Sequence, residues 1–312
     1  MTALPAHEWT RRQWLWLMAS GATAAAGTLV HGQARSTRPL GVQLYTVREL
    51  LKTQPEETLK AIAAIGYKTI ELGRGDLDRL VPIAKSAGLT AVSTHVEVSI
   101  VTPKAGPGST VDASEQASID DGMARAFDAI RKHGLTWAVV PYLDKKLRPA
   151  DADGWKRFGE QLNRAGAAAK KAGLGFGYHN HGFEFETVAG GKRRALDILD
   201  GTFDHALVKW ELDVFWVGIT GANPVALLKK FGNRIALVHL KDKAKGAPQA
   251  TDEGKVAKAT FAEVGSGALD FPAILKAAEA AGVKEFFVEQ DWTPADPIES
   301  LRQSYAYLTT LT

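Results

Sequence analysis

Residues 206–240 read ALVKWELDVFWVGITGANPVALLKKFGNRIALVHL, and they contain a complete strand, helix and strand. The stretch begins and ends with an apolar run, the second at 235–240, and each run has the length of a buried strand. Between the runs, Asn223 and Pro224 provide a cap and a first-turn proline for a helix, and Gly232 provides its end. This order is typical of a βα unit in a parallel sheet.

The same alternation continues along the chain from Pro39 onward. We predict eight strands, at residues 40–44, 69–72, 90–94, 137–141, 175–178, 206–212, 235–240 and 285–289. No glycine fingerprint follows the first strand, so an open dinucleotide-binding sheet is not favoured. Eight βα units predict an α/β protein with a single (β/α)8 TIM barrel.

The N-terminus differs in composition from the rest of the chain. Arg11 and Arg12 precede an uncharged stretch rich in Ala, Gly and Leu. This pattern is typical of a twin-arginine export signal, with an uncleaved anchor as the alternative. We therefore predict a signal over residues 1–34, a barrel over residues 35–312, and a periplasmic or secreted protein with no stable membrane span after cleavage.

Composition narrows the possible ligands and partners. The formal net charge is +3, and the 38 basic and 35 acidic residues are interspersed, so nucleic acid is not an expected partner. The chain has no cysteine, which excludes disulfides and thiolate metal sites. Any metal must therefore be bound by nitrogen and oxygen ligands.

Polar residues gather at the predicted C-terminal ends of the strands, which in a barrel meet on one face. A single histidine or carboxylate at such a place is more often structural than functional. Here the pattern occurs on four consecutive strands, which favours a functional site. The residues at these ends are Glu71, His95, His179, Asn180, His181, Glu211, Asp213, His239, Lys241, Asp242, Glu289, Gln290 and Asp291.

At these residues the chain resembles the xylose isomerase-like TIM-barrel superfamily, which contains sugar isomerases, sugar epimerases and inosose dehydratases. The resemblance covers essentially the whole mature chain and would make it a twin-arginine-exported member. Its most specific motifs are 178–181 (YHNH), 183–185 (FEF), 211–216 (ELDVFW), 238–242 (VHLKD), 264–267 (VGSG) and 288–289 (VE).

The resemblance implies a divalent metal site. In the superfamily, strands five, six and eight each provide an acidic ligand and strand seven provides a histidine. Matching the motifs gives His179, Asp213, His239 and Glu289 as ligands, with His179 in the place usually held by Glu. Two imidazoles and two carboxylates suit Mn, our first choice, and also Co, Fe or Zn, better than Ca.

The resemblance also implies roles in catalysis and binding. Glu289 would remove a proton next to a metal-chelated carbonyl, and His181 or His95 would protonate an adjacent position or a leaving oxygen. Lys241 would stabilise negative charge while Asp242 orients it. The partner would be a small-molecule sugar or glycoside. Substrate contacts are expected from Glu71, His95, Asn180 and Trp216, although Trp216 can equally be a packing residue of the barrel rim.

Several functions remain open from the sequence. The leading one is a metal-dependent sugar isomerase or epimerase. The predicted export and the missing strand-five carboxylate favour a second, a lyase or hydrolase that cleaves 3-keto-glycosides by elimination. A non-catalytic sugar-binding barrel is a third. A DNA repair endonuclease is disfavoured by the weak charge and the export signal.

Overall fold

The computed structural model describes residues 39–294 and 296–311, which form a closed barrel of parallel strands. The predicted export signal, residues 1–34, lies outside the described residues. The strand order around the barrel is β1-β10-β7-β6-β5-β4-β3-β2, which confirms the predicted (β/α)8 fold. The strands are β1 (Leu40–Gln43), β2 (Thr69–Leu72), β3 (Thr90–His95), β4 (Trp137–Val140), β5 (Gly175–His179), β6 (Val208–Asp213), β7 (Ile235–Leu240) and β10 (Glu285–Val288).

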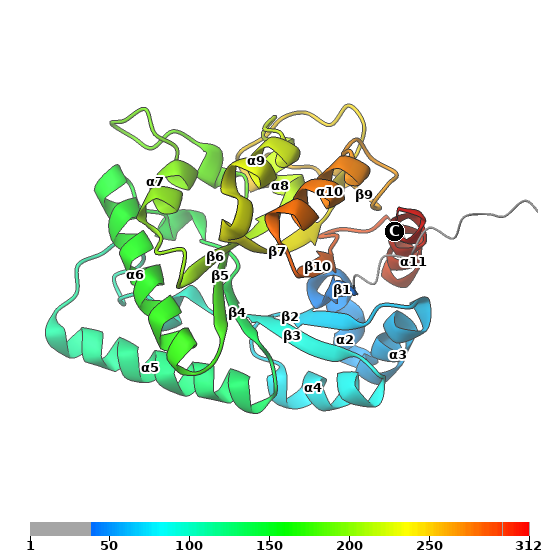
Figure 1. Cartoon of the computed structure of the whole chain (residues 1–312), viewed down its shortest axis with the longest axis horizontal. Helices are drawn as coiled ribbons and strands as arrows, with labels where there is room; N and C mark the ends of the chain where they lie inside the picture. The colour runs from blue at the N-terminus through cyan, green and yellow to red at the C-terminus, as the bar shows by residue number, and fades with distance from the viewer. Residues whose placement is uncertain (1–38, 295, 312) are drawn as a thin grey trace, which may run out of the picture. The chain divides into compact units, whose positions relative to one another are not determined.

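Helices connect successive strands and lie outside the ring of strands (Figure 1). The α-helices are α2 (Arg48–Thr53), α3 (Pro55–Ile65), α4 (Leu77–Ser86), α5 (Ala113–Lys132), α6 (Ala152–Lys171), α7 (Ala195–Thr202), α8 (Val214–Ile219), α9 (Pro224–Phe231), α10 (Phe271–Ala281) and α11 (Pro297–Thr310). Short 3-10 turns are η1 (Leu44–Val47), η2 (Val98–Ile100), η3 (Lys145–Leu147), η4 (Phe183–Phe185), η5 (Gly232–Arg234), η6 (Glu253–Lys255) and η7 (Lys258–Thr260). None of the helices in the described part of the chain is long and apolar enough to span a membrane.

The barrel interior has an apolar floor beneath a polar layer. Val139, Leu237 and Phe287 are fully buried and form their own cluster, separate from the large core of the protein. Alternate residues of a barrel strand point inward. His239 follows Leu237 by two positions, and Glu289 follows Phe287 by two positions. The inward-pointing side chains therefore change from apolar to titratable between one inward position and the next.

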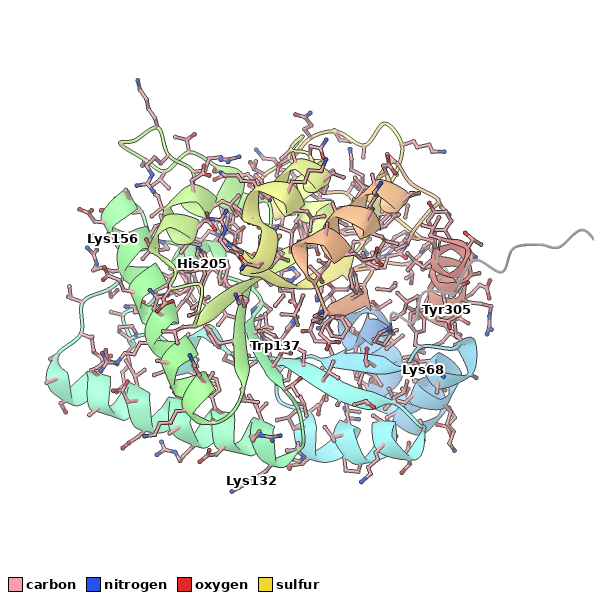
Figure 2. All side chains as sticks on the ribbon, viewed as in Figure 1. Lys68, Lys132, Trp137, Lys156, His205 and Tyr305 are labelled. Carbon is pink, nitrogen blue, oxygen red and sulfur yellow. The ribbon has the colours of Figure 1, made fainter. Side chains whose placement is uncertain are left out.

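Two glycines make room for aromatic rings at this floor. A Cβ atom on Gly41 would lie 2.6 Å from the ring of Phe287, and one on Gly175 would lie 2.5 Å from the ring of Trp137, which is labelled in Figure 2. Both separations are far below van der Waals contact. The aromatic packing that supports the polar layer therefore requires glycine at both positions.

The segment after β7 forms part of the wall above the barrel. It begins with β8 (Asp242–Lys243), which pairs with β9 (Phe261–Ala262) in an antiparallel ladder. Two ion pairs fix the segment to the loop between β4 and α6: Lys145 Nζ with Asp252 Oδ2 at 3.0 Å, and Arg148 Nη2 with Glu253 Oε2 at 3.1 Å. The ring of Phe183 packs under the Arg148 guanidinium, which lies 3.6 Å from its centroid.

Candidate active site

A cavity of about 620 Å³ opens at the C-terminal ends of the strands. This is where the catalytic residues of (β/α)8 enzymes gather. Its lining combines charged, imidazole and aromatic side chains, which suits a polyhydroxylated ligand. The lining residues are Tyr45, Gly73, Arg74, His95, Pro141, Tyr142, His179, His181, Trp216, Lys241, Glu253, Val256, Phe261, Glu289 and Asp291.

Four buried carboxylates lie at two levels below and beside this cavity. We call Asp213 and Glu289 the upper carboxylates and Glu71 and Glu211 the lower carboxylates. Glu211 precedes Asp213 by two positions on β6, so it points inward one layer deeper in the barrel. Glu71, Glu211 and Asp213 have no exposed surface, and Glu289 is 6% exposed.

Two histidines join the levels. The Nδ1 atom of His179 lies 2.9 Å from Glu211 Oε2, and its Nε2 atom lies 3.6 Å from Asp213 Oδ2. The Nε2 atom of His239 lies 2.7 Å from Glu71 Oε1, and its Nδ1 atom lies 2.8 Å from Glu289 Oε2. Each imidazole therefore directs one nitrogen to a lower carboxylate and the other to an upper carboxylate.

Lys241 lies among the acidic groups of the upper level. Its Nζ atom is 3.1 Å from Asp213 Oδ2, 2.8 Å from Glu289 Oε2 and 2.7 Å from Asp291 Oδ1. Burial by itself would lower the pKa of Lys241, but the three carboxylates outweigh burial and raise the pKa well above its usual value. Lys241 is thus an ammonium ion at the wall of the cavity.

Burial and charge set the protonation of the other groups. Burial lowers the pKa of His179 well below its usual value, and nearby cationic groups lower it further. Burial raises the pKa of Asp213 to about 6. For Glu289 the effect of burial is overcome by Lys241 and His239, which lower its pKa. At neutral pH the neutral imidazole of His179 and the upper carboxylates are in the forms that bind metal ions.

His181 lies beside aromatic rings at the cavity. Its ring centroid is 4.8 Å from that of Tyr142 and 5.0 Å from that of Trp216, and its buried Nδ1 atom has no hydrogen-bond partner. Glu184 fixes the backbone of His181, because the His181 N–H donates to Glu184 Oε2 at 2.8 Å. The hydroxyl of Tyr178 donates to the other oxygen of Glu184 at 2.7 Å.

The stability of the protein should fall as pH rises because of Glu184. Burial raises its pKa to about 8, whereas in the unfolded chain it titrates near 4.5. The folded state thus holds this proton more tightly, so the stabilisation is complete below pH 4.5 and is lost as pH rises through 8. Thermal unfolding between pH 5 and 9 should show a decline of up to about 1.4 kcal/mol per pH unit. In Glu184→Gln this part of the decline should vanish, and an unchanged slope would contradict the assignment.

The residues expected from the sequence lie in two groups. Those at the cavity surface are His95, His179, His181, Trp216, Lys241 and Glu289. Those beneath it, which do not line the cavity, are Glu71, Asn180, Asp213 and His239. Asn180 Oδ1 accepts a hydrogen bond from the backbone N–H of Asp213 at 3.0 Å, so Asn180 fixes the backbone of an expected ligand.

Three residues of the site had no assigned role in the sequence. Gln43 Nε2 donates to Glu71 Oε1 at 2.8 Å, and Ser93 Oγ donates to Glu71 Oε2 at 2.5 Å. Glu211 contacts the imidazole of His179. The period of two along β6 was the available signal for Glu211, because it places Glu211 on the same inward face as Asp213.

The donor set fits a divalent metal. Two groups have ligand atoms that all lie within 4.8 Å of one another: His179, Asp213 and His239 form one, and Glu71, His95, Glu211 and His239 form the other. Asp213 Oδ2 is buried and accepts no hydrogen bond, although the Lys241 ammonium approaches it. An unsatisfied buried carboxylate oxygen beside imidazole nitrogens suits a metal with mixed nitrogen and oxygen ligands.

A closed parallel barrel with titratable side chains at the C-terminal strand ends defines a class, the (β/α)8 barrel enzymes with a candidate metal centre. The chain belongs to the xylose isomerase-like TIM barrel family, whose sequence model matches residues 59–311. This establishes the family that the sequence motifs indicated.

Individual relatives show two kinds of enzyme. Inosose dehydratase from Clostridium beijerinckii is 29% identical over 164 residues, which cover 49% of this chain and 53% of the dehydratase. The chain therefore spans about half the length of the curated relatives it matches. The crystal structure of a sugar phosphate isomerase/epimerase from Parabacteroides distasonis superposes with a TM-score of 0.72 at 26% identity, covering 89% of this chain and 95% of that protein.

A third comparison concerns the fold alone. A solved IolI protein with a binding zinc atom superposes with a TM-score of 0.65 at 17% identity, covering 88% of this chain and 97% of that one. The same barrel thus occurs in a protein that binds a divalent metal.

Proposed function

We propose that this protein is a divalent-metal-dependent isomerase or epimerase that acts on a sugar or glycoside. The observation that carries the proposal is the convergence of His179, Asp213 and His239 at the base of a cavity whose wall contains Glu289. This is the arrangement needed to hold a cation beside a base. The chain belongs to the xylose isomerase-like TIM barrel family, and it is similar to a solved sugar phosphate isomerase/epimerase and to inosose dehydratases.

In this proposal His179, Asp213, His239 and Glu289 hold the metal, with Mn as first choice. When bound, the metal supplies Lewis acidity that stabilises negative charge on a substrate carbonyl oxygen. Glu289 takes the proton from the carbon beside the carbonyl through a carboxylate oxygen. Lys241 contributes positive charge from the cavity wall.

His181 and the cavity surface complete the roles. His181 lines the cavity and in this proposal returns a proton to the substrate. Trp216 and His95 line the cavity and contact the substrate. The mixed lining of aromatic and charged side chains suits a sugar, whose rings have apolar faces and polar edges.

A second candidate is a lyase that eliminates a leaving group after the same proton removal. One observation favours it: β5 ends in His179, so this strand provides no carboxylate to pair with Glu289 in a symmetric two-base epimerisation. In an elimination, Glu289 takes the proton from carbon, the electron pair forms the double bond, and His181 protonates the departing oxygen. The inosose dehydratase relatives support this reading.

Metal removal tests both functions. The purified protein is treated with a chelator, dialysed and resupplied with Mn²⁺, then incubated in D₂O with ketoses, inososes and 3-keto-glycosides. We expect carbon-bound deuterium to appear only with metal, as seen by NMR. Exchange or isomer formation indicates the isomerase, and loss of water or an aglycone indicates the lyase. If the protein binds sugar independently of metal and no deuterium is incorporated, it is a non-catalytic sugar-binding barrel. That result would contradict both the isomerase and the lyase.

We also propose that the chain is exported through the twin-arginine route, as the motif at Arg11 and Arg12 suggests. Cell fractionation should find the protein outside the cytoplasm, shortened by about 34 residues at the N-terminus. Replacing both arginines with lysine should retain the full-length protein inside the cell. Export of the doubly substituted protein would contradict the proposal.

A further inference from the structure

We infer that Glu211 and Glu71 are positioning residues that fix the tautomers of the two metal-binding histidines. The inference rests on the proposed function, because it concerns the metal of that site. It goes beyond that function because it assigns the lower carboxylates, which do not line the cavity, a role in metal affinity. It gives Glu71 a role different from the substrate contact expected from the sequence.

The hydrogen-bond chemistry of imidazole carries the first step. A neutral histidine has one N–H donor and one lone-pair nitrogen, and an ionised carboxylate can only accept. His179 Nδ1 lies 2.9 Å from Glu211 Oε2, and His239 Nε2 lies 2.7 Å from Glu71 Oε1. We assign the protons to these nitrogens from their partners. The lone pair of neutral His179 is then on Nε2, which faces Asp213. His239 faces a carboxylate with each nitrogen, so we assign its remaining proton to Nε2, beside Glu71, when a metal takes Nδ1 beside Glu289.

The surroundings of the lower carboxylates carry the second step. Glu71 is held in place by Gln43 and Ser93, which donate to its two oxygens at 2.8 and 2.5 Å. Neither lower carboxylate forms an ion pair with a lysine or arginine within residues 39–294 and 296–311; their ion pairs there are with histidines. Buried carboxylates without such a partner are costly unless another positive charge compensates them.

A cation bound through the two imidazoles would add positive charge beside these carboxylates. A carboxylate that accepts the second N–H of a metal-binding histidine orients the ring and makes it a better ligand. Glu211 Oε2 lies 2.9 Å from His179 Nδ1 and 3.3 Å from His239 Nε2. The carboxylate of Glu211 is therefore directed at both histidines.

The alternative is that the lower carboxylates bind the ion themselves, together with His95 and His239, whose ligand atoms are close enough. One observation argues against it: both oxygens of Glu71 already accept hydrogen bonds from uncharged donors, Gln43 and Ser93.

The test measures metal affinity in the full-length protein with Mn²⁺ and Co²⁺, by calorimetry and by the visible spectrum of Co²⁺. For Glu211→Gln we expect one bound ion per chain and an affinity about 10- to 100-fold lower. The matched control is Glu184→Gln, the same exchange at another fully buried carboxylate, and its affinity should stay within about threefold. Asp213→Asn should lose stoichiometric binding.

A second readout needs neither metal nor turnover. In the metal-free protein, imidazole ¹⁵N shifts should show His179 protonated on Nδ1, and Glu211→Gln should give a mixture of tautomers. If Glu211→Gln misfolds, Glu71→Gln replaces it with Mn²⁺ affinity as the readout, because metal-free His239 contacts a carboxylate through each nitrogen. An unchanged affinity and tautomer in a folded variant overturns the inference, as does a wild-type protein that binds no metal.

The two placements of the ion also give opposite results. Loss of binding in Glu211→Gln together with normal binding in Asp213→Asn places the ion among the lower carboxylates and overturns the inference. Absence of turnover on every substrate, with the expected affinity changes, overturns only the proposed function.

Discussion

The exchange Glu289→Gln is expected to lower turnover by about 10³-fold or more. Glu289 is both the proposed base and a proposed metal ligand, and an amide can neither take a proton nor neutralise a cation. Its oxygen Oε2 also lies 2.8 Å from His239 Nδ1 and pairs with Lys241 Nζ at 2.8 Å. The exchange therefore removes charge from the centre of the upper level.

The measurement is steady-state turnover in the presence of saturating Mn²⁺, with bound metal determined in parallel. Glu285→Gln is the matched control, because Glu285 begins the same strand β10 and does not line the cavity. It should keep turnover within about threefold of the wild-type value, as substitutions remote from the reacting atoms usually do. Turnover by Glu289→Gln equal to that of this control would contradict the proposed role of Glu289.

The fold could be predicted because the residues that begin and end its helices are local signals in the sequence. The Asn223 side chain accepts hydrogen bonds from the first backbone N–H groups of α9, and Gly232, with φ 53°, follows the end of that helix, as the sequence indicated. The predicted strand at 206–212 starts two residues late, at Val208. Asp204 Oδ1 accepts the N–H of Ala206 at 2.9 Å, and this turn removes the residue from the ladder.

The candidate site was only partly predictable, because its contacts cross the barrel. The sequence placed His239 and Glu289 at strand ends. It did not indicate that His239 meets Glu71, which lies 168 positions away in the chain. That contact depends on the register in which the barrel closes, including the shift between Ile70 and Glu71 in the pairing of β2 with β3. The two-residue period of a strand shows which face of the sheet a side chain lies on, but it does not show how deep in the barrel the side chain lies.

Asp242 differs most from its sequence-based interpretation. It was expected to orient Lys241, but the Lys241 ammonium is paired with other carboxylates. The carboxylate of Asp242, 1% exposed, accepts backbone hydrogen bonds instead. The donors are the N–H groups of Lys243 at 2.8 Å, Gly265 at 3.1 Å, Gly267 at 2.9 Å, Ala268 at 3.1 Å and Leu269 at 3.1 Å.

Asp242→Ala is therefore expected to destabilise the protein by about 3 kcal/mol or more, since it leaves several buried N–H groups without an acceptor. The loop packs closely around this carboxylate, because a Cβ atom at Gly267 would collide with Asp242 and the Lys243 carbonyl. Urea unfolding provides the measurement. Asp242→Asn keeps one acceptor oxygen and should lose less stability than Asp242→Ala.

The control for this effect is Asp270→Ala, which removes the carboxylate that caps α10 by accepting from Ala273 N–H at 3.0 Å. That loss should cost about 1 kcal/mol, the usual value of an exposed helix cap. The ratio of the two losses separates a carboxylate that organises a whole buried loop from one that satisfies a single donor. Equal losses would mean that water accepts these hydrogen bonds in place of Asp242. The conformation of the loop before α10 would then depend on its glycines rather than on the Asp242 carboxylate.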